Sequence, residues 1–272
     1  MTQPTPLTDR RALARNRARA EISKLFLQEA ARDEIEDRLR MVNKSFSSVG
    51  IVAAFPDHWR ERLAHSTVFA EAETLPFEAS EYDLVIHSLG LHWVNDPVGQ
   101  LIQCRRALQT DGLLLAVALG GQTLHELRAS LAEAEVAITG GLSPRVAPMA
   151  EVRDLGALLQ RAGLALPVAD TVPLRASYQS MWHLMYDLRS MGEVNALTGR
   201  SRTMTSQSIF DRAAEIYADT FADDAGGVIA TYELIILTGW APDASQQQPL
   251  RPGSAQARLA DALQTRETPL PD

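Results

Sequence analysis

The stretch DLVIHSLGLHWVNDPVGQLIQCRRALQTDGLLLAVALGG, residues 83–121, reads as a strand, a helix and a second strand, and this order decides the fold. The apolar runs 83–89 and 113–119 are short and continuous, which is typical of strands buried in a parallel sheet. Between them, Asp96 is a suitable helix N-cap and Pro97 suits the first helical position, where its missing N–H does no harm. The stretch therefore predicts one unit of an α/β fold.

Similar segments on both sides extend this alternation. Further strands are predicted at 49–55, 68–71, 171–178 and 228–240, and helices at 123–139, 150–162, 180–191 and 208–221. Residues 10–40 are predicted to form one long helix or two abutting ones. Alternating strands and helices favour right-handed crossovers and a sheet that is covered on both faces. We expect an N-terminal helical arm at 1–45, an α/β domain with helical insertions at 46–241, and a disordered tail at 242–272.

The composition excludes several classes of protein. Cys104 is the single cysteine of the 272 residues, so an intrachain disulfide or a cysteine-based zinc site cannot form, and its helical position predicts a core residue. There is no apolar run long enough to span a membrane. No metal is expected, because the six histidines are not spaced as metal ligands usually are. A net charge of −8 opposes nucleic-acid binding. These features predict a cytoplasmic protein.

An arginine-rich segment near the N-terminus departs from the acidic average. Five arginines crowd this segment, namely Arg10, Arg11, Arg15, Arg17 and Arg19. One interpretation is a solvated helix with segregated charge. The other is a docking arm for an acidic partner, or for peripheral contact with anionic lipid.

Residues 70–121 resemble the middle of a class I methyltransferase that depends on S-adenosylmethionine (SAM). More narrowly, the chain resembles the group that contains the malonyl-acyl-carrier-protein methyltransferase of biotin synthesis and, with closer agreement, the methyltransferase-like assembly factor of respiratory complex I. The segments that carry this second resemblance are GGQTLHELR, GGLSPRVAP, VRDLGALLQRAG, LRSMGEVNAL, ATYELIILTGW and SQQQPLRPGSA. The resemblance implies a Rossmann-like sheet with SAM across the carboxyl ends of its strands.

The first half of the expected cofactor site is altered. The family carries a glycine-rich turn such as DLGCGTG after its first strand, whereas this chain has AAFPDHW at 53–59. Only residues 56–66 separate the first two strands, so we expect that one βα unit is missing and the fold is truncated in its first half. Glu71 matches the family's adenine-reading carboxylate, and Ala72, His92 and Trp93 complete the expected cofactor contacts.

Other segments are expected to face a substrate or partner. The resemblance assigns Glu193 and Asn195 to this side, although alone they would read as a helix C-terminus. Gly120 and Gly121 would allow a close backbone approach or simply form a tight turn. Arg145, between two prolines, either recognises an anion or ties its loop to a helix end.

Two functions remain open from the sequence. One is a non-catalytic protein with a degenerate SAM site that binds a partner, which by resemblance would be a respiratory-complex subunit. The other is an active SAM-dependent methyltransferase or protein-arginine hydroxylase, in which His92 would act as the base.

Overall fold

A single mixed sheet forms the centre of the computed structural model. The strands are β1 (Val49–Ala53), β2 (Ser66–Ala70), β3 (Tyr82–Ser88), β4 (Leu108–Leu119), β5 (Ala165–Tyr178) and β6 (Val228–Trp240). The structure describes residues 5–60, 62–247, 253–254 and 258–266, and within these ranges six strands pair in the order β2-β1-β3-β4-β6-β5. The strands β1 to β4 are parallel, whereas β6 runs antiparallel between β4 and β5. The Rossmann-like α/β class expected from the sequence is confirmed, and each predicted strand is present.

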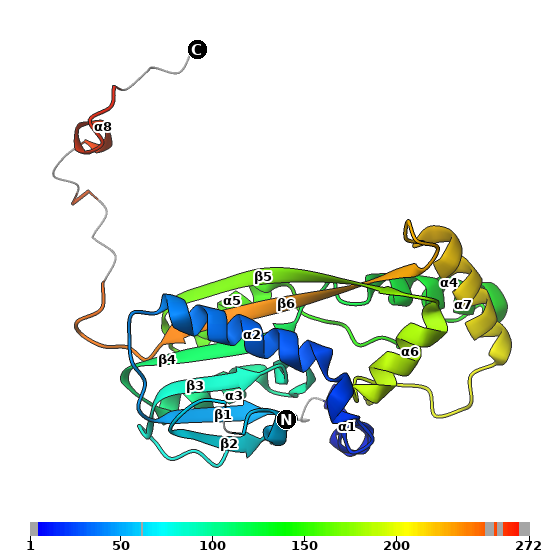
Figure 1. Ribbon diagram of the computed structural model, residues 1–272, viewed down its shortest axis with the longest axis horizontal. Helices are drawn as coiled ribbons and strands as arrows, with labels where there is room; N and C mark the ends of the chain where they lie inside the picture. The colour runs from blue at the N-terminus through cyan, green and yellow to red at the C-terminus, as the bar shows by residue number, and fades with distance from the viewer. Residues whose placement is uncertain (1–4, 61, 248–252, 255–257, 267–272) are drawn as a thin grey trace. The chain divides into compact units, whose positions relative to one another are not determined.

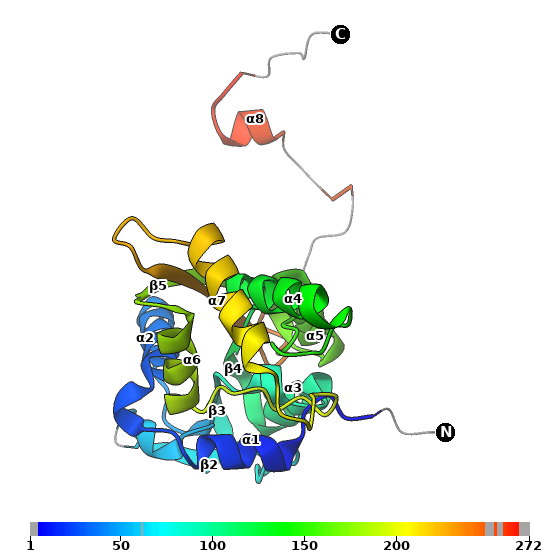
Figure 2. The ribbon, with the colours of Figure 1, turned by 90° about the vertical axis from the view of Figure 1, so that its right-hand side faces the viewer.

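Helices cover both faces of this sheet. The helices are α1 (Arg10–Arg17), α2 (Phe26–Met41), α3 (Pro97–Ala107), α4 (His125–Thr139), α5 (Val152–Arg161), α6 (Met181–Ser190), α7 (Gln207–Thr220) and α8 (Leu259–Ala262), with 3-10 helices at Ile22–Lys24, Pro56–His58 and Leu91–Trp93. Figure 1 shows α2 crossing one face of the sheet, with α3 and α5 on the other side. Figure 2 shows α1, α4, α6 and α7 gathered at the end of the sheet toward which the parallel strands run.

The alternation of side chains along each strand builds two separate cores. On β4, Leu115 faces the core under α2, α4, α6 and α7, whereas Leu114 and Ala116 face the core under α3 and α5. Cys104 of α3 is fully buried in the second core, as predicted. Asp96 caps α3 by accepting a hydrogen bond from the backbone N–H of Gly99 at 2.8 Å, which confirms the predicted helix start.

The N-terminal segment forms two helices, which was one of the two arrangements predicted for residues 10–40. A turn containing the 3-10 helix Ile22–Lys24 separates α1 from α2. Leu27, Ala31 and Ile35 of α2 are almost completely buried in the first core. The chain up to Pro242 packs as one unit, so α2 belongs to the same packing unit as the sheet.

The residues from Asp243 onward form a second unit. Much of the predicted disordered tail at 242–272 lies outside the described residues, and its described part includes α8. In the part of the chain that the structure describes, no helix is long and apolar enough to cross a membrane.

The connection between β1 and β2 is short and bulky. It contains the 3-10 helix Pro56–His58, and turns follow in the described residues 59–60 and 62–65. Trp59 is fully buried in the first core and Phe55 packs against the same core. The connection after β1 therefore carries large side chains and does not form an open glycine turn.

Candidate functional site

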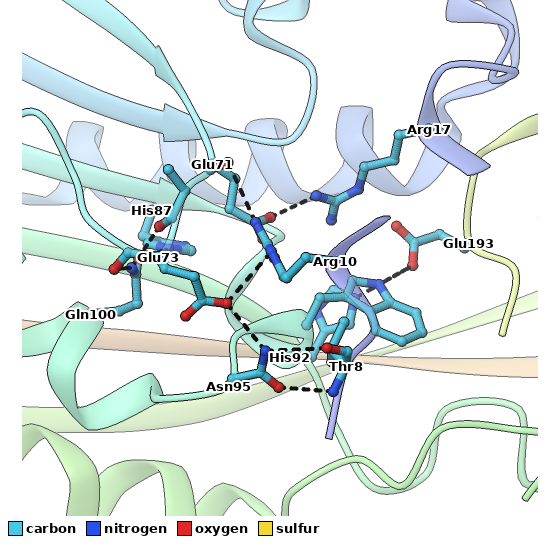
Figure 3. A network of polar contacts seen from close by, with 12 residues as sticks. Thr8, Arg10, Arg17, Glu71, Glu73, His87, His92, Asn95, Gln100 and Glu193 are labelled. Atoms are coloured by element: carbon cyan, nitrogen blue, oxygen red, sulfur yellow. Dashed lines mark hydrogen bonds and ion pairs between the residues drawn. The ribbon is translucent and has the colours of Figure 1, made fainter. Parts of the chain in front are cut away.

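Glu71 lies directly after β2, at the carboxyl edge of the parallel strands. Its side chain is only 2% exposed, and both of its oxygens are bound by α1. Arg10 Nη1 donates to Glu71 Oε1 at 2.5 Å, and Arg17 Nη1 donates to Glu71 Oε2 at 2.8 Å. Burial raises the pKa of Glu71, but the charges of Arg17 and Arg10 outweigh it and hold that pKa below its usual value. The carboxylate is thus a charged anchor for α1 (Figure 3).

A buried histidine lies behind this anchor. His87 of β3 is fully buried, and its Nε2 lies 3.3 Å from Gln100 Oε1. Gln100 Nε2 in turn donates to the carbonyl of Ala72 at 2.7 Å. A Cβ atom at Gly90 would lie 2.4 Å from Glu71 Oε2, so the absence of a side chain there allows Glu71 to reach its position. Burial lowers the pKa of His87, which keeps the imidazole neutral.

Trp93, His92 and Glu193 meet although the two segments lie about a hundred residues apart in sequence. Trp93 Nε1 donates to Glu193 Oε2 at 2.7 Å, and His92 Nε2 lies 3.5 Å from the same oxygen. The side chains of His92 and Glu193 are 2% and 6% exposed. Burial raises the pKa of Glu193, but His92, Arg17 and Trp93 together lower it below its usual value. The site therefore contains a buried, ionised carboxylate.

A cavity of about 290 Å³ opens beside this carboxylate. Glu193 and Trp93 form part of its wall, and aliphatic side chains of α4 and α6, among them Leu127 and Leu188, form another part. A mostly apolar cavity with a few polar groups is the usual form of a binding site for an organic ligand or side chain.

Arg145 lies on the same cavity wall, and its donors are occupied. Its Nε and Nη2 donate to the two carboxylate oxygens of Glu135 on α4 at 2.9 and 2.6 Å, and its Nη1 donates to Thr205 Oγ1 at 2.9 Å. These hydrogen bonds hold the pKa of Glu135 below its usual value. Asn195 donates to the carbonyl of Pro144 at 2.8 Å. Both residues thus fix the loop that carries Arg145.

The glycine pair after β4 is approached by two carboxylates. A Cβ atom at Gly120 would lie 2.3 Å from Glu233 Oε2, and one at Gly121 would lie 2.2 Å from Glu151 Oε1. The backbone N–H of Gln122 donates to Glu233 Oε2 at 3.1 Å. The space beside these glycines is therefore taken by the protein's own side chains.

Comparisons with known proteins agree with this geometry. The family described as "Methyltransferase domain" matches residues 41–116. The chain is a methyltransferase-family protein. It is 38% identical over 194 residues to the arginine-hydroxylase NDUFAF5 of Danio rerio, covering 71% of this chain and 60% of that protein. It is 40% identical over 189 residues to the Homo sapiens protein of the same name, covering 70% and 54%. It is also 34% identical over 190 residues to the malonyl-acyl-carrier-protein O-methyltransferase of Laribacter hongkongensis, covering 70% and 61%.

The methyltransferase-family chain thus spans between 54% and 61% of the length of these relatives. Among solved structures, the YcgJ protein of Bacillus subtilis matches with a TM-score of 0.49 and 13% identity, covering 78% of this chain and 99% of that one. A Haemonchus contortus phosphoethanolamine N-methyltransferase in complex with S-adenosylhomocysteine matches with a TM-score of 0.43 and 10% identity, covering 78% and 53%.

In this methyltransferase-family chain, Glu71 lines only a small cavity of about 190 Å³, which it shares with Ala54, Ala70 and residues of α1 that include Arg10 and Arg17. Phe55 and Pro56 follow β1 where the family has glycines, and Trp59 fills the core beneath them. Both oxygens of Glu71 are bound by arginines. The described arrangement therefore does not fit SAM in the family's usual manner. No group of three or more His, Cys, Asp or Glu side chains is placed to hold a metal within the described ranges.

The structure brings five of the predicted site residues to one cavity. His92, Trp93 and Glu193 meet directly, while Arg145 and Asn195 fix a loop at the same cavity. The contacts between α1 and Glu71 were missed by the sequence reasoning, because arginines in a helix are usually solvated. Their only sequence signal was the crowding of five arginines at 10–19, where four of the other five residues are apolar.

Proposed function

We propose that this protein is a methyltransferase-like protein that recognises a partner protein. Its nucleotide edge, the carboxyl edge of the parallel strands at Glu71 where the family binds SAM, is closed by its own helix α1. The observation that carries the proposal is the ion-paired Glu71, which is buried under Arg10 and Arg17. In the family such a carboxylate would face a ligand. Here it binds the chain itself, and the bulky connection after β1 supports the same conclusion because it removes the close backbone approach that SAM requires.

The resemblance to the complex I assembly factor supports a protein as the partner, with a respiratory-complex subunit as its class. The segments that carry this resemblance, around Arg145 and Glu193, line the 290 Å³ cavity rather than the nucleotide edge. A chain that keeps this cavity, while α1 closes the edge of the sheet at Glu71, is suited to recognition of a partner protein. The βα unit that the sequence indicates is missing agrees with the absence of an α-helix in the described residues 54–60 and 62–65.

Titration with SAM and S-adenosylhomocysteine tests this proposal. A ligand that binds only the folded state at 100 times its Kd stabilises it by about 2.7 kcal/mol, which would raise the Tm by roughly 5–10 °C in a chain of this size. We expect no shift at millimolar ligand. Saturable binding at micromolar ligand would contradict the closed edge.

A second function is favoured by the match of residues 41–116 to the methyltransferase family. In this second function, α1 would leave Glu71 and SAM would bind. The protein would then act as a methyltransferase or, like the relatives named arginine-hydroxylase, on an arginine. The double variant Arg10→Ala/Arg17→Ala separates the two functions. If removal of these arginines creates SAM binding, the edge is a gated cofactor site; if it does not, the edge has lost the cofactor.

A further inference from the structure

One face of α1 carries a row of exposed arginines. Arg11 and Arg15 lie four residues apart on α1 and therefore on the same face of the helix. Arg19 continues this spacing in the turn after α1, where its backbone N–H donates to the carbonyl of Asn16 at 3.1 Å. All three residues are exposed, and Figure 2 shows α1 along the outside of the unit that ends at Pro242. Arg11, Arg15 and Arg19 thus form an arginine stripe.

The remaining residues of α1 fix the direction in which the stripe points. Ala12 and Leu13 are buried. Arg10 and Arg17 are engaged in ion pairs with Glu71. The stripe is therefore presented by a helix that is already seated on the fold. A partner can bind the stripe without displacing either ion pair of Glu71.

Positive charge is in excess around the stripe. Residues 10–24 contain six cationic side chains and one carboxylate, that of Glu21. Two of the six cations, Arg10 and Arg17, pair with Glu71, whereas the arginines of the stripe form no ion pair with any residue that the structure describes. The chain as a whole carries a net charge of −8. This local excess is complementary to a negatively charged partner and not to the average surface of the chain itself.

The spacing of the stripe indicates the form of that partner. Residues four apart on a helix are separated by about 6 Å along its axis, so Arg11 and Arg19 are separated by roughly 12 Å. A helix with Glu or Asp at every fourth position presents its carboxylates at the same spacing. The planar guanidinium group of arginine binds a carboxylate through two parallel hydrogen bonds. The stripe therefore matches an acidic helix.

The residues between the arginines favour a protein over a membrane surface. The exposed positions beside the arginines of the stripe are Ala14 and Ala18, which carry only a methyl group. A helix that lies in a membrane surface inserts large apolar side chains on one face. Ile22, 66% exposed, is the only large apolar side chain that is exposed among residues 10–24. One such side chain is normal on a protein surface.

We propose that the arginine stripe binds an acidic helix of a partner protein, with carboxylates at every fourth position of that helix. This inference rests on the proposed recognition of a protein partner and names the chemistry of the surface that the partner presents. Because the stripe and the ion pairs of Glu71 lie on different faces of α1, the inference holds whether or not SAM binds at Glu71.

A pair of designed peptides tests the inference on the full chain. The probe is an alanine-based helix of about 20 residues with glutamate at every fourth position, and the comparison peptide gathers the same glutamates at one end. Fluorescence anisotropy of the labelled peptides measures binding. We expect saturable binding of the probe, weaker binding of the comparison peptide, and a loss of affinity as the salt concentration is raised. Equal binding of the two peptides, or no binding of the probe, would overturn the inference.

The triple variant Arg11→Gln/Arg15→Gln/Arg19→Gln removes the stripe and leaves the ion pairs of Glu71 in place. We expect it to bind the probe about 5- to 100-fold more weakly, since three exposed ion pairs are lost together. Unchanged affinity would show that the probe binds elsewhere and would refute the assignment. If this variant does not fold, the two peptides and the salt dependence on the wild type decide alone.

A matched control removes the same charge from another surface. The variant Arg153→Gln/Arg161→Gln/Arg175→Gln replaces three exposed arginines of α5 and β5 and changes the net charge of the chain equally. It should bind the probe as the wild type does. An equal loss of affinity in the two triple variants would mean that net charge alone attracts the probe, which contradicts a specific stripe.

Lipid vesicles decide between a protein and a membrane as the partner. We expect no sedimentation of the wild type with vesicles of phosphatidylglycerol and phosphatidylcholine under conditions in which the probe binds. Sedimentation that the stripe variant loses would identify a lipid surface as the occupant and would exclude the acidic helix. Titration with SAM reports on Glu71 instead, so SAM binding would contradict the closed edge and leave the outcome for the stripe unaffected.

Discussion

Replacement of Arg17 by methionine tests whether α1 is anchored through Glu71. Methionine keeps the apolar stem but removes the guanidinium that donates to Glu71 Oε2 at 2.8 Å. Removing one partner of a buried ion pair costs about 3–5 kcal/mol, and because Arg10 remains bound to Glu71 we expect a smaller loss, about 2–3 kcal/mol. Urea denaturation measures this as a lower midpoint at an unchanged slope.

The control and the double variant make this prediction specific. Arg15→Met, at an exposed position of the same helix, should change the free energy of unfolding by less than about 0.5 kcal/mol. Adding Glu71→Gln to Arg17→Met should recover part of the loss, because the side chain at position 71 is then uncharged and no longer needs the guanidinium of Arg17. A loss below about 0.5 kcal/mol in Arg17→Met, or strict additivity in the double variant, would refute the anchoring of α1.

The same ion pair makes stability depend on pH. The folded-state pKa of Glu71 is lowered, so its contribution is fully present above the unfolded-state pKa of about 4.3 and is lost as the pH falls toward the folded-state value. As the pH is lowered, the free energy of unfolding should therefore fall less steeply in Glu71→Gln than in the wild type. An identical dependence of the free energy of unfolding on pH in the two proteins would show that Glu71 has the same pKa in the folded and unfolded states.

Three further predictions concern other parts of the fold. Arg145→Lys loses the two-point contact with Glu135 and should lower the free energy of unfolding by about 1–3 kcal/mol in urea; an unchanged midpoint would show that the pair adds nothing. Gly120→Ala places a Cβ atom 2.3 Å from Glu233 Oε2 and should cost about 1–3 kcal/mol in the same assay, unless that side chain moves without loss. Cys104 is fully buried and burial raises its pKa to about 12, so a thiol reagent should label it only in denaturant; rapid labelling of the native protein would contradict this.

The sheet could be predicted from the sequence because local patterns determine it. The central strands β3 and β4 contain short apolar runs, and the face to which a residue belongs follows from a period of two, as Leu114 and Leu115 show. The start of α3 was also local, since Asp96 and its partner Gly99 lie three residues apart. Such features depend on neighbours in the chain, so one sequence is sufficient to find them.

The polar contacts of the site could be predicted only in part. The segments of Trp93 and Glu193 were both identified, but nothing in their spacing indicates that these two side chains form a hydrogen bond. The arginines of α1 were interpreted as solvated or as a docking arm, whereas two of them lie against Glu71. Long-range ion pairs depend on the complete fold, because the partners become neighbours only after the sheet and its helices have packed.

The chemistry of a carboxylate explains how a helix can take the place of a nucleotide. Glu71 at the end of β2 needs hydrogen-bond donors, and in this family an amine or hydroxyl of the cofactor would supply them. The guanidinium groups of Arg10 and Arg17 supply N–H donors and positive charge at the same carboxylate. Because the donors now belong to the chain, a ligand must displace two ion pairs before it can bind Glu71. On the proposed function, a few arginines and a short connection would close the cofactor edge of a methyltransferase scaffold, while its sheet and the cavity at Glu193 are kept.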